Sequence, residues 1–470
     1  MNRRDLDLGT GLATVSYKHD GTTFTREHFS SHPDQLTAIH LAADKAGKIS
    51  FGLNLTSLHK NISVTAKTIN ANQTQLVLTG QVDNGKGNPE GLKFEAVVQI
   101  QTLGGSLQAT DGKVDIRDAD EVIILVAGAT NYQLAYPSYK GEAPDKKNQS
   151  VLEAAAGKSY AALKKRHIDD HQSLFQRVKL DLGQVHRSDL PTDQRIAQYA
   201  KSRDDHGLEE ILFQYGRYLL IASSRPGGLP ANLQGLWNNS NSPPWMCDYH
   251  LNINMQMNYW PVDSANLSEC AEPMVEWAVD LQQPGAKSAK VHYDARGWVV
   301  HHSANTWGYT PPGPARGKHM MEAESGAFLC QNLWDHYAFT QDKEYLANDL
   351  WPLLKGASEF WIDNLQEVEG GELAVSPSYS PEQGPLSDGA FYQTMIIWDL
   401  FTHTIAAGRE LGEDETFLKQ LKTTRQRLQK PRVGTYGQLM EWRDAKLEKG
   451  ANKNKHRHVS MMWAIYPGHE

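Results

Sequence analysis

The chain has 470 residues, of which 40% are hydrophobic and 22% charged, a globular balance that at this length predicts two or more domains. The formal net charge of −8 leaves no basic surface for nucleic acid, and no run approaches the roughly 18 apolar residues of a membrane helix, so neither partner is expected. The three cysteines are too few and too scattered for a disulfide framework or a zinc site.

Residues 1 to 145 are predicted to form an N-terminal antiparallel β-sandwich. An Asp-Gly turn at Asp20 separates two alternating runs, which is a hairpin signal. Glycine-bearing breaks separate the further strand candidates, whose polar faces are filled by Thr, Ser and Asn. These candidates are Leu36–Ala42, Ile49–Leu55, Gln75–Leu78, Leu92–Ile100 and Val122–Val126.

A change of architecture is expected after the sandwich, because all 12 tryptophans lie at or after Trp237. Residues 146–206 are predicted to be a helical linker, in which apolar residues between Tyr160 and Val178 recur near helical spacing. A short strand at Val178–Leu182 and a polar connection at Arg187–Asp205 are expected to complete it.

Residues 207–470 are predicted to be a helical catalytic domain of the α/α toroid type. The apolar segment Leu208–Ser223 is expected to be an inner helix. Long aromatic loops at Arg225–His250 and Gly297–His319 are expected to be functional, because loops of that length are unusual in a compact domain. The other expected helices are Ser325–Tyr337, Glu344–Asn364, Phe391–Gly408 and Asp414–Leu428.

Four segments of the helical half carry the most distinctive residues. They are Arg225-Pro-Gly-Gly-Leu-Pro-Ala-Asn-Leu-Gln-Gly-Leu-Trp-Asn-Asn with its continuation Asp248-Tyr-His-Leu-Asn-Ile-Asn, Trp298-Val-Val-His-His-Ser, Ser376-Pro-Ser-Tyr-Ser-Pro-Glu, and His456-Arg-His-Val-Ser. Together they closely resemble glycoside hydrolase family 95, which contains α-L-fucosidases and some α-L-galactosidases. The resemblance covers essentially the whole chain and implies a β-sandwich, a helical linker and an (α/α)6 toroid.

The resemblance also implies that the chain is a fragment. It ends at Glu470, before the family's Asp-containing segment and the last toroid helices, and Met1 falls inside the family's N-terminal domain. By the same resemblance the parent enzyme would be periplasmic or secreted.

Glu382 is the candidate general acid. Two prolines and three serines before it stiffen its loop, which suits a carboxyl that protonates a leaving oxygen, provided its surroundings raise its pKa. The resemblance assigns it that role. Asn252 and Asn254, two residues apart, would share one face of an extended segment. The resemblance implies that they hold the attacking water and that Asn254 acts as the base, polarised by the family's aspartate.

The resemblance further assigns sugar contacts to His250, Trp307, Arg457 and His458. His301-His302, His319, His456 and His458 show no metal-binding spacing, and no metal or other cofactor is expected. The predicted activity is hydrolysis of a terminal α-L-fucosyl linkage, α1,2 to galactose, with inversion, on a fucosylated oligosaccharide. Two alternatives stay open, namely an α-L-galactosidase and a catalytically inactive carbohydrate-binding fragment.

Overall fold

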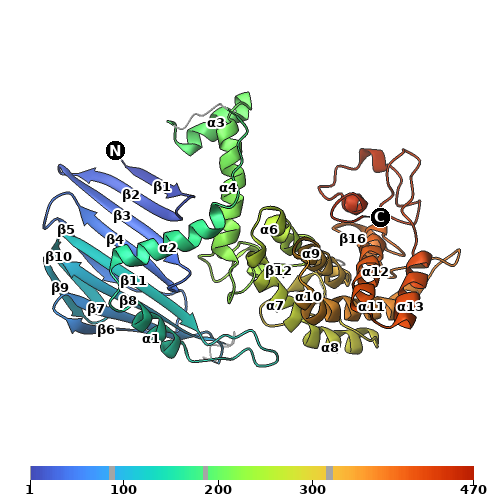
Figure 1. Cartoon of the computed structure of the whole chain (residues 1–470), viewed down its shortest axis with the longest axis horizontal. Helices are drawn as coiled ribbons and strands as arrows, with labels where there is room; N and C mark the ends of the chain where they lie inside the picture. Colours follow the sequence, from blue (N-terminus) through green and yellow to red (C-terminus); the bar gives the residue numbers. More distant parts are fainter. Residues whose placement is uncertain (1, 84–89, 184–188, 314–320, 470) are drawn as a thin grey trace. The chain divides into compact units, whose positions relative to one another are not determined.

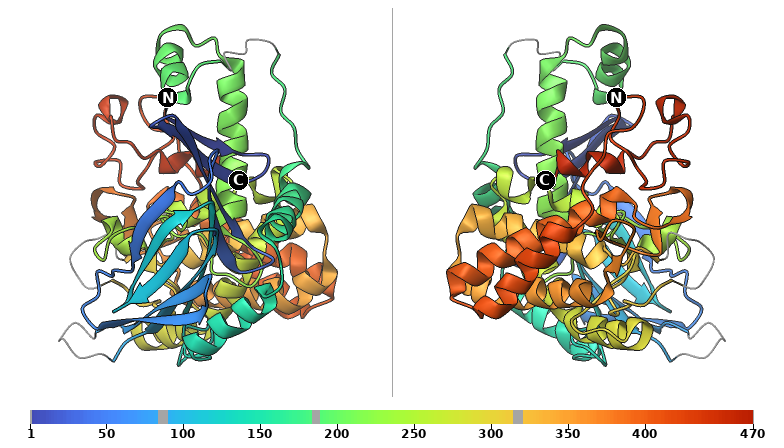
Figure 2. Two further views of the ribbon diagram at one scale, coloured as in Figure 1. Left: turned by 90° about the vertical axis from the view of Figure 1, so that its left-hand side faces the viewer. Right: turned by 90° about the vertical axis from the view of Figure 1, so that its right-hand side faces the viewer.

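The structure is a computed structural model that describes residues 2–83, 90–183, 189–313 and 321–469 (Figures 1 and 2). The chain forms two compact units. The first comprises Met1–Gln133 and Tyr139–Ala222, and the second comprises Leu134–Ser138 and Ser223–Glu470. The predicted fold class, an antiparallel β-sandwich followed by a helical linker and a helical domain, is confirmed. Among the described residues, no helix is long and apolar enough to cross a membrane.

The first unit contains two antiparallel sheets. The larger has the strand order β1-β2-β3-β4-β11-β8-β7-β6, and the smaller has the order β5-β10-β9. The strands are β1 (Arg3–Asp7), β2 (Leu12–His19), β3 (Thr22–Ser31), β4 (Leu36–Ala43), β5 (Ile49–Asn54), β6 (Ile62–Asn70), β7 (Gln73–Gln81), β8 (Lys93–Leu103), β9 (Ser106–Thr110), β10 (Lys113–Ala119) and β11 (Glu121–Thr130).

The alternation of side chains along β11 explains why this strand lies at the centre of the unit. Val122 and Ile124 join the core between the two sheets, together with Leu76, Ile100 and Ile116. The intervening positions face the other side of the large sheet, where α1 (Pro144–Ala155) and α2 (Tyr160–Phe175) cover it. The expected hairpin is confirmed, since Asp20 and Gly21 both have positive φ in the two-residue turn between β2 and β3.

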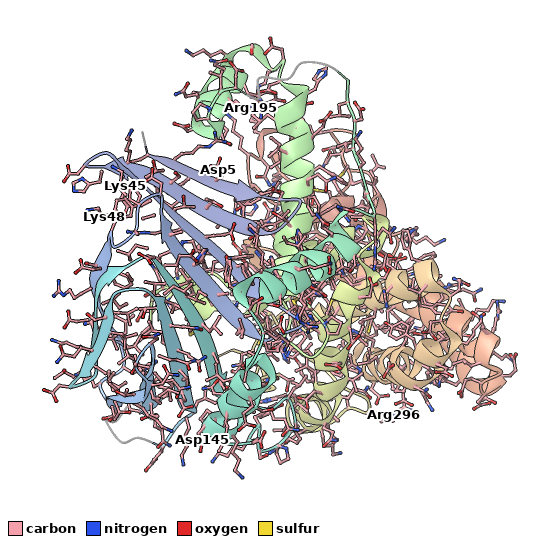
Figure 3. The ribbon with its side chains drawn as sticks, turned by 60° about the vertical axis from the view of Figure 1, so that its left-hand side comes forward. Asp5, Lys45, Lys48, Asp145, Arg195 and Arg296 are labelled. Atoms are coloured by element: carbon pink, nitrogen blue, oxygen red, sulfur yellow. The ribbon has the colours of Figure 1, made fainter. Side chains whose placement is uncertain are left out.

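The segment between α2 and the second unit differs from its prediction. Residues Val178–Leu182 form no strand, and the polar connection contains α3 (Thr192–Ser202). A buried ion pair holds it, because the Arg195 guanidinium donates to both carboxylate oxygens of Asp205 at 2.9 and 2.7 Å. Figure 3 labels Arg195 on this helix. The next helix, α4 (His206–Ser223), forms as expected, and it is only partly buried, since Leu212 is 71% exposed whereas Leu220 and Ile221 are buried.

The second unit is built from helices with short two-stranded sheets in its loops. Its α-helices are α5 (Asn254–Tyr259), α6 (Pro261–Ser264), α7 (Glu272–Asp280), α8 (Gln282–Tyr293), α9 (Ser325–Thr340), α10 (Lys343–Tyr345), α11 (Trp351–Asn364), α12 (Phe391–Leu411) and α13 (Glu415–Arg427). Its strands are β12 (Tyr249–His250), β13 (Ser303–Ala304), β14 (Gln366–Glu367), β15 (Leu373–Ala374), β16 (Ser378–Ser380) and β17 (Gln383–Ser387). Helices α11, α12 and α13 lie side by side (Figures 1 and 2).

Two glycines allow the segment before β13 to lie directly on α11. Gly297 has a φ of +66°, and a Cβ there would overlap the carbonyl of Gly356 in α11. A Cβ on Gly356 would in turn lie 2.7 Å from Cδ1 of Trp298. The buried indole of Trp298 donates to the Leu353 carbonyl at 2.9 Å. This close approach fixes the backbone that leads to His302.

We expect Gly297→Ala to lower the free energy of unfolding by about 3 kcal/mol or more, because positive φ and overlap with α11 both oppose a methyl group. Gly412→Ala is the matched control. Gly412 also has positive φ (+74°) but has no atom within 4 Å of a Cβ, so only the backbone cost of about 1 kcal/mol is expected there. Chemical denaturation of both variants measures the difference. Equal losses would show that the approach to α11 tolerates a side chain.

Candidate active site

Glu382 lies at the turn between β16 and β17, which are paired at Ser380 and Gln383. Buried serines hold this hairpin, since the Ser378 hydroxyl donates to Gln393 of α12 at 2.6 Å. The carboxylate of Glu382 forms an ion pair with Arg457 and lies 3.7 Å from Nε2 of His458. The structure therefore brings three of the predicted site residues together, although they are 75 residues apart in the chain.

The pKa of Glu382 differs from the one expected for a general acid. Partial burial raises the pKa of Glu382, but the Arg457 guanidinium, with contributions from His458 and His302, outweighs burial and holds this pKa below its usual value. The expected condition, surroundings that raise the pKa, is therefore not met while Arg457 contacts the carboxylate.

A second carboxyl, that of Glu322, completes the cluster. Glu322 is fully buried, and its Oε2 lies 2.8 Å from Nδ1 of His302. Burial raises the pKa of Glu322 well above its usual value, the negative charge of Glu382 raises it further, and the amide of Asn252 opposes the rise. The two carboxyls are thus close enough for the charge of Glu382 to affect the pKa of Glu322, and their pKa values shift in opposite directions.

Sequence reasoning missed Glu322. It precedes the apolar helix α9 by only three positions, and Glu324 beside it is also fully buried. Two acidic residues at the start of an apolar helix are usually read as favourable first-turn charges on a solvated end. The only available signal was that a Met-Glu-Ala-Glu-Ser stretch continues directly into a helix that is apolar on most sides.

The asparagine pair does not have the expected conformation. Asn252 lies in a turn and is buried, whereas Asn254 is the first residue of α5, so the segment is not extended and the two side chains are not related by strand alternation. The backbone of Ile253, with φ −174° and ψ −33°, makes the transition. Asn252 lies near enough to Glu322 to lower the pKa of its carboxyl, which places Asn252 beside the carboxyl cluster.

His250 joins the cluster through His302. Its strand β12 pairs with β13, placing His250 opposite Ser303, and the rings of His250 and His302 are 4.6 Å apart at 71°. Nδ1 of His250 contacts the carboxylate of Asp248, which orients the ring. Backbone pairing between β12 and β13, rather than a flexible loop, therefore fixes the position of the His250 ring.

The sequence analysis also named Trp307 and His301, which have other surroundings. Trp307 follows β13 in a loop, where its backbone N–H donates to Asn305 at 2.9 Å, and its side chain is 47% exposed. His301 points away from His302, toward the Thr310 carbonyl and the Tyr293 hydroxyl, and burial lowers its pKa to about 4. His319 falls outside the described residues.

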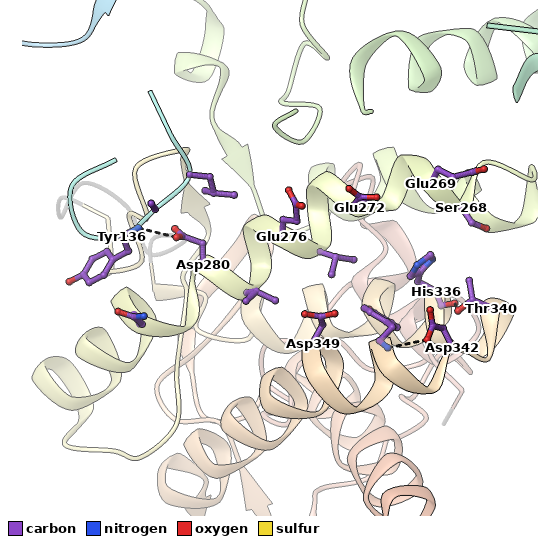
Figure 4. A pocket seen from close by; sticks show the side chains of 16 residues that line it. Tyr136, Ser268, Glu269, Glu272, Glu276, Asp280, His336, Thr340, Asp342 and Asp349 are labelled. Atoms are coloured by element: carbon purple, nitrogen blue, oxygen red, sulfur yellow. Dashed lines mark hydrogen bonds between the residues drawn. The ribbon is translucent and has the colours of Figure 1, made fainter. Parts of the chain in front are cut away.

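One cavity of the second unit adjoins the predicted residues. It has a volume of about 400 Å³ and is lined by His456 and His458, on either side of Arg457. A second cavity, of about 940 Å³, is lined by none of the predicted residues. Figure 4 shows this second cavity, whose wall includes the acidic side chains of Glu269, Glu272, Glu276, Asp280, Asp342 and Asp349. Of these two cavities, the smaller one adjoins predicted site residues.

Comparison with solved structures supports the two-part architecture. The fold resembles that of a protein named "Putative kojibiose phosphorylase from human microbiome", with a TM-score of 0.64 and 12% identity over 94% of this chain and 58% of the other. Residues 2–135 match the family model "Glycosyl hydrolase family 65, N-terminal domain". The fold of this chain is thus shared with that protein.

Sequence relatives define the family. Residues 159–470 match the glycosyl hydrolase family 95 catalytic domain. The chain is 34% identical to "Alpha-L-fucosidase 2" of Arabidopsis thaliana and 35% identical to "Probable alpha-fucosidase A" of Aspergillus niger, in each case over 99% of its length. It spans 59% and 60% of the lengths of these two relatives. The chain belongs to glycosyl hydrolase family 95.

The raised pKa of Glu322 makes a prediction about stability and pH. A carboxyl with a higher pKa in the folded state contributes stability that is complete below its unfolded pKa and is lost as pH rises through the folded pKa. Gln resembles the protonated carboxyl and cannot ionise. We therefore expect Glu322→Gln to lessen the fall in melting temperature between about pH 5 and pH 9. The exposed Glu344→Gln serves as control, and parallel profiles for Glu322→Gln and the parent chain would contradict the prediction.

Proposed function

We propose that the chain carries the general acid of a glycosidase that hydrolyses terminal α-L-fucosyl linkages, α1,2 to galactose, with inversion at the anomeric carbon. The observation that carries this proposal is the turn that holds Glu382 against Arg457 and His458, beside the buried pair of His302 and Glu322. The fucosidase names of the two relatives support the choice of sugar.

Glu382 would donate the proton to the departing glycosidic oxygen. For this step Arg457 must leave the carboxylate, since its charge holds the pKa of Glu382 low. A guanidinium has five N–H donors suited to sugar hydroxyls. A bound sugar that takes these donors would weaken the ion pair, and burial together with any charge on Glu322 would then raise the pKa of Glu382. Substrate binding and protonation of the acid would thus be coupled.

Asn252 and Asn254 would hold the water that attacks the opposite face of the sugar. A neutral amide oxygen is a weak base, and it needs a hydrogen-bond partner that fixes its orientation. Glu322 lies close enough to Asn252 to serve as that partner. In inverting glycosidases the acid and the base are roughly 6.5–9.5 Å apart, which leaves room for this water.

His250 would discriminate between sugars at C5. L-fucose carries a methyl group where L-galactose carries a hydroxymethyl group, so the volume beside the imidazole decides which fits. Asp248 and His302 hold the ring in place on two sides. A rigid ring excludes a larger substituent better than a mobile one.

Proton NMR of the chain with 2′-fucosyllactose tests the reaction. We expect the β-anomer of L-fucose to appear first and then to mutarotate. Glu382→Gln should lower kcat by about a hundredfold or more, because general acid catalysis is lost. The same variant should keep most of its activity on α-L-fucosyl fluoride, because fluoride leaves without protonation.

Glu322→Gln is the comparison for this experiment. If it loses activity on 2′-fucosyllactose and keeps activity on the fluoride, while Glu382→Gln loses both, the acid is Glu322 and the assignment of Glu382 is wrong. Appearance of α-L-fucose first would contradict inversion. Binding of the sugar without release from the folded chain would support the carbohydrate-binding alternative.

Replacing His250 by a residue with a smaller side chain should shift the substrate preference toward L-galactose. We expect His250→Ala to raise the ratio of kcat/KM for an α-L-galactoside to that for the matching α-L-fucoside by about tenfold, the effect of one small group in a pocket. His292→Ala, in the exposed last turn of α8, provides the control for loss of an imidazole. An unchanged ratio would remove His250 from the choice of sugar and would leave the α-L-galactosidase alternative equally supported.

A further inference from the structure

Two metal-binding side chains face the same way from α12, away from the residues assigned above. Asp399 and His403 are one helical turn apart, so they lie on one face of the helix. Both are buried, with 1% and 6% of their surfaces exposed. A buried carboxylate next to a buried imidazole is uncommon without an ionic or hydrogen-bonded partner.

The third side chain, that of His469, reaches this face because Gly468 lacks a Cβ. A Cβ on Gly468 would lie 2.6 Å from Oδ2 of Asp399 and would also overlap the Trp463 indole. The Trp463 indole and the His469 backbone N–H both donate to Oδ2 of Asp399, at 2.9 and 3.3 Å. One oxygen of Asp399 is therefore held by the segment that brings His469.

The other oxygen of Asp399, Oδ1, is buried and has no hydrogen-bond partner among the described residues. One ligand atom from each of Asp399, His403 and His469 lies within 4.8 Å of the other two. No hydrogen bond joins these three side chains within the described part of the chain, and the His403 ring is instead stacked on Trp334 at 4.7 Å and 8°. Each of the three side chains thus offers a ligand atom close enough to the others to share one ion.

The charges around the three side chains also favour a cation. Asp335 lies near enough to Asp399 and His469 to add negative potential.

We propose that Asp399, His403 and His469 bind one divalent transition-metal ion of the Zn²⁺ class. One carboxylate oxygen and two imidazole nitrogens form a donor set typical of Zn²⁺, which takes four ligands at about 2.0–2.2 Å. The side chain of His469 is exposed, so solvent can supply the fourth ligand. Mg²⁺ and Ca²⁺ are disfavoured, because these ions prefer oxygen ligands only.

The ion would fasten residues 460–469 to α12. That segment begins two residues after His458. The hydroxyl groups of Ser460 and of Ser380, in β16, both donate to the carboxylate of Glu441. Metal binding would therefore support the placement of Arg457 and His458 without contacting a sugar. This is a structural role and does not depend on the fucosidase proposal.

Isothermal titration of the EDTA-treated chain with ZnSO4 tests the site. We expect one Zn²⁺ per chain, a rise in melting temperature at saturating Zn²⁺, and visible absorption bands of a four-coordinate ion after titration with Co²⁺. His469→Ala should weaken Zn²⁺ binding at least about tenfold and abolish the Co²⁺ bands. Its exposed side chain makes this variant the one expected to fold normally.

His292→Ala, which removes an exposed imidazole from α8, is the matched control and should bind Zn²⁺ as the parent chain does. Asp399→Asn, which keeps the shape of the side chain, provides a second test and should also bind at least about tenfold more weakly. The proposal is overturned if the parent chain shows no stoichiometric binding, or if His469→Ala and Asp399→Asn bind Zn²⁺ as tightly as His292→Ala.

Discussion

The close approach of two backbones, at Gly297 and Gly356, is the constraint on which the candidate site depends. It seats Trp298 in the helical core and directs the following four residues, so that His301 and His302 face opposite ways. His301 then hydrogen-bonds to the Thr310 carbonyl and the Tyr293 hydroxyl, whereas His302 hydrogen-bonds to Glu322. Helix packing thereby decides which of two adjacent histidines contacts Glu322.

The two carboxyls of the site show how burial and charge divide one residue type into two states. Glu322 is enclosed by protein and meets a neutral amide and an imidazole, so burial dominates and its pKa rises. Glu382 is at a turn beside the Arg457 guanidinium, whose charge outweighs burial, so its pKa falls. Of the two carboxyls, Glu322 is therefore the one that keeps its proton more readily.

Much of the fold could be predicted from local patterns, and the failures have physical causes. The Asp20-Gly21 hairpin and the long helices α9 and α12 follow from turn chemistry and apolar periodicity, which act within a few residues. The conformation of Asn252–Asn254 and the order of α3 depend on partners outside those windows, such as the Arg195–Asp205 pair. Glu382, Arg457 and His458 were predicted through family resemblance. Glu322 was missed because its burial is a property of the assembled domain.

The ion pair between Glu382 and Arg457 joins residues 75 positions apart, and this separation sets the order in which the site can assemble. During synthesis the β16–β17 turn leaves the ribosome well before Arg457 exists, so Glu382 first meets water as an ordinary surface carboxylate. Closing that long loop is entropically costly and comes after local helices have formed. The contact between Glu382 and Arg457 is therefore expected to form after the helices between them.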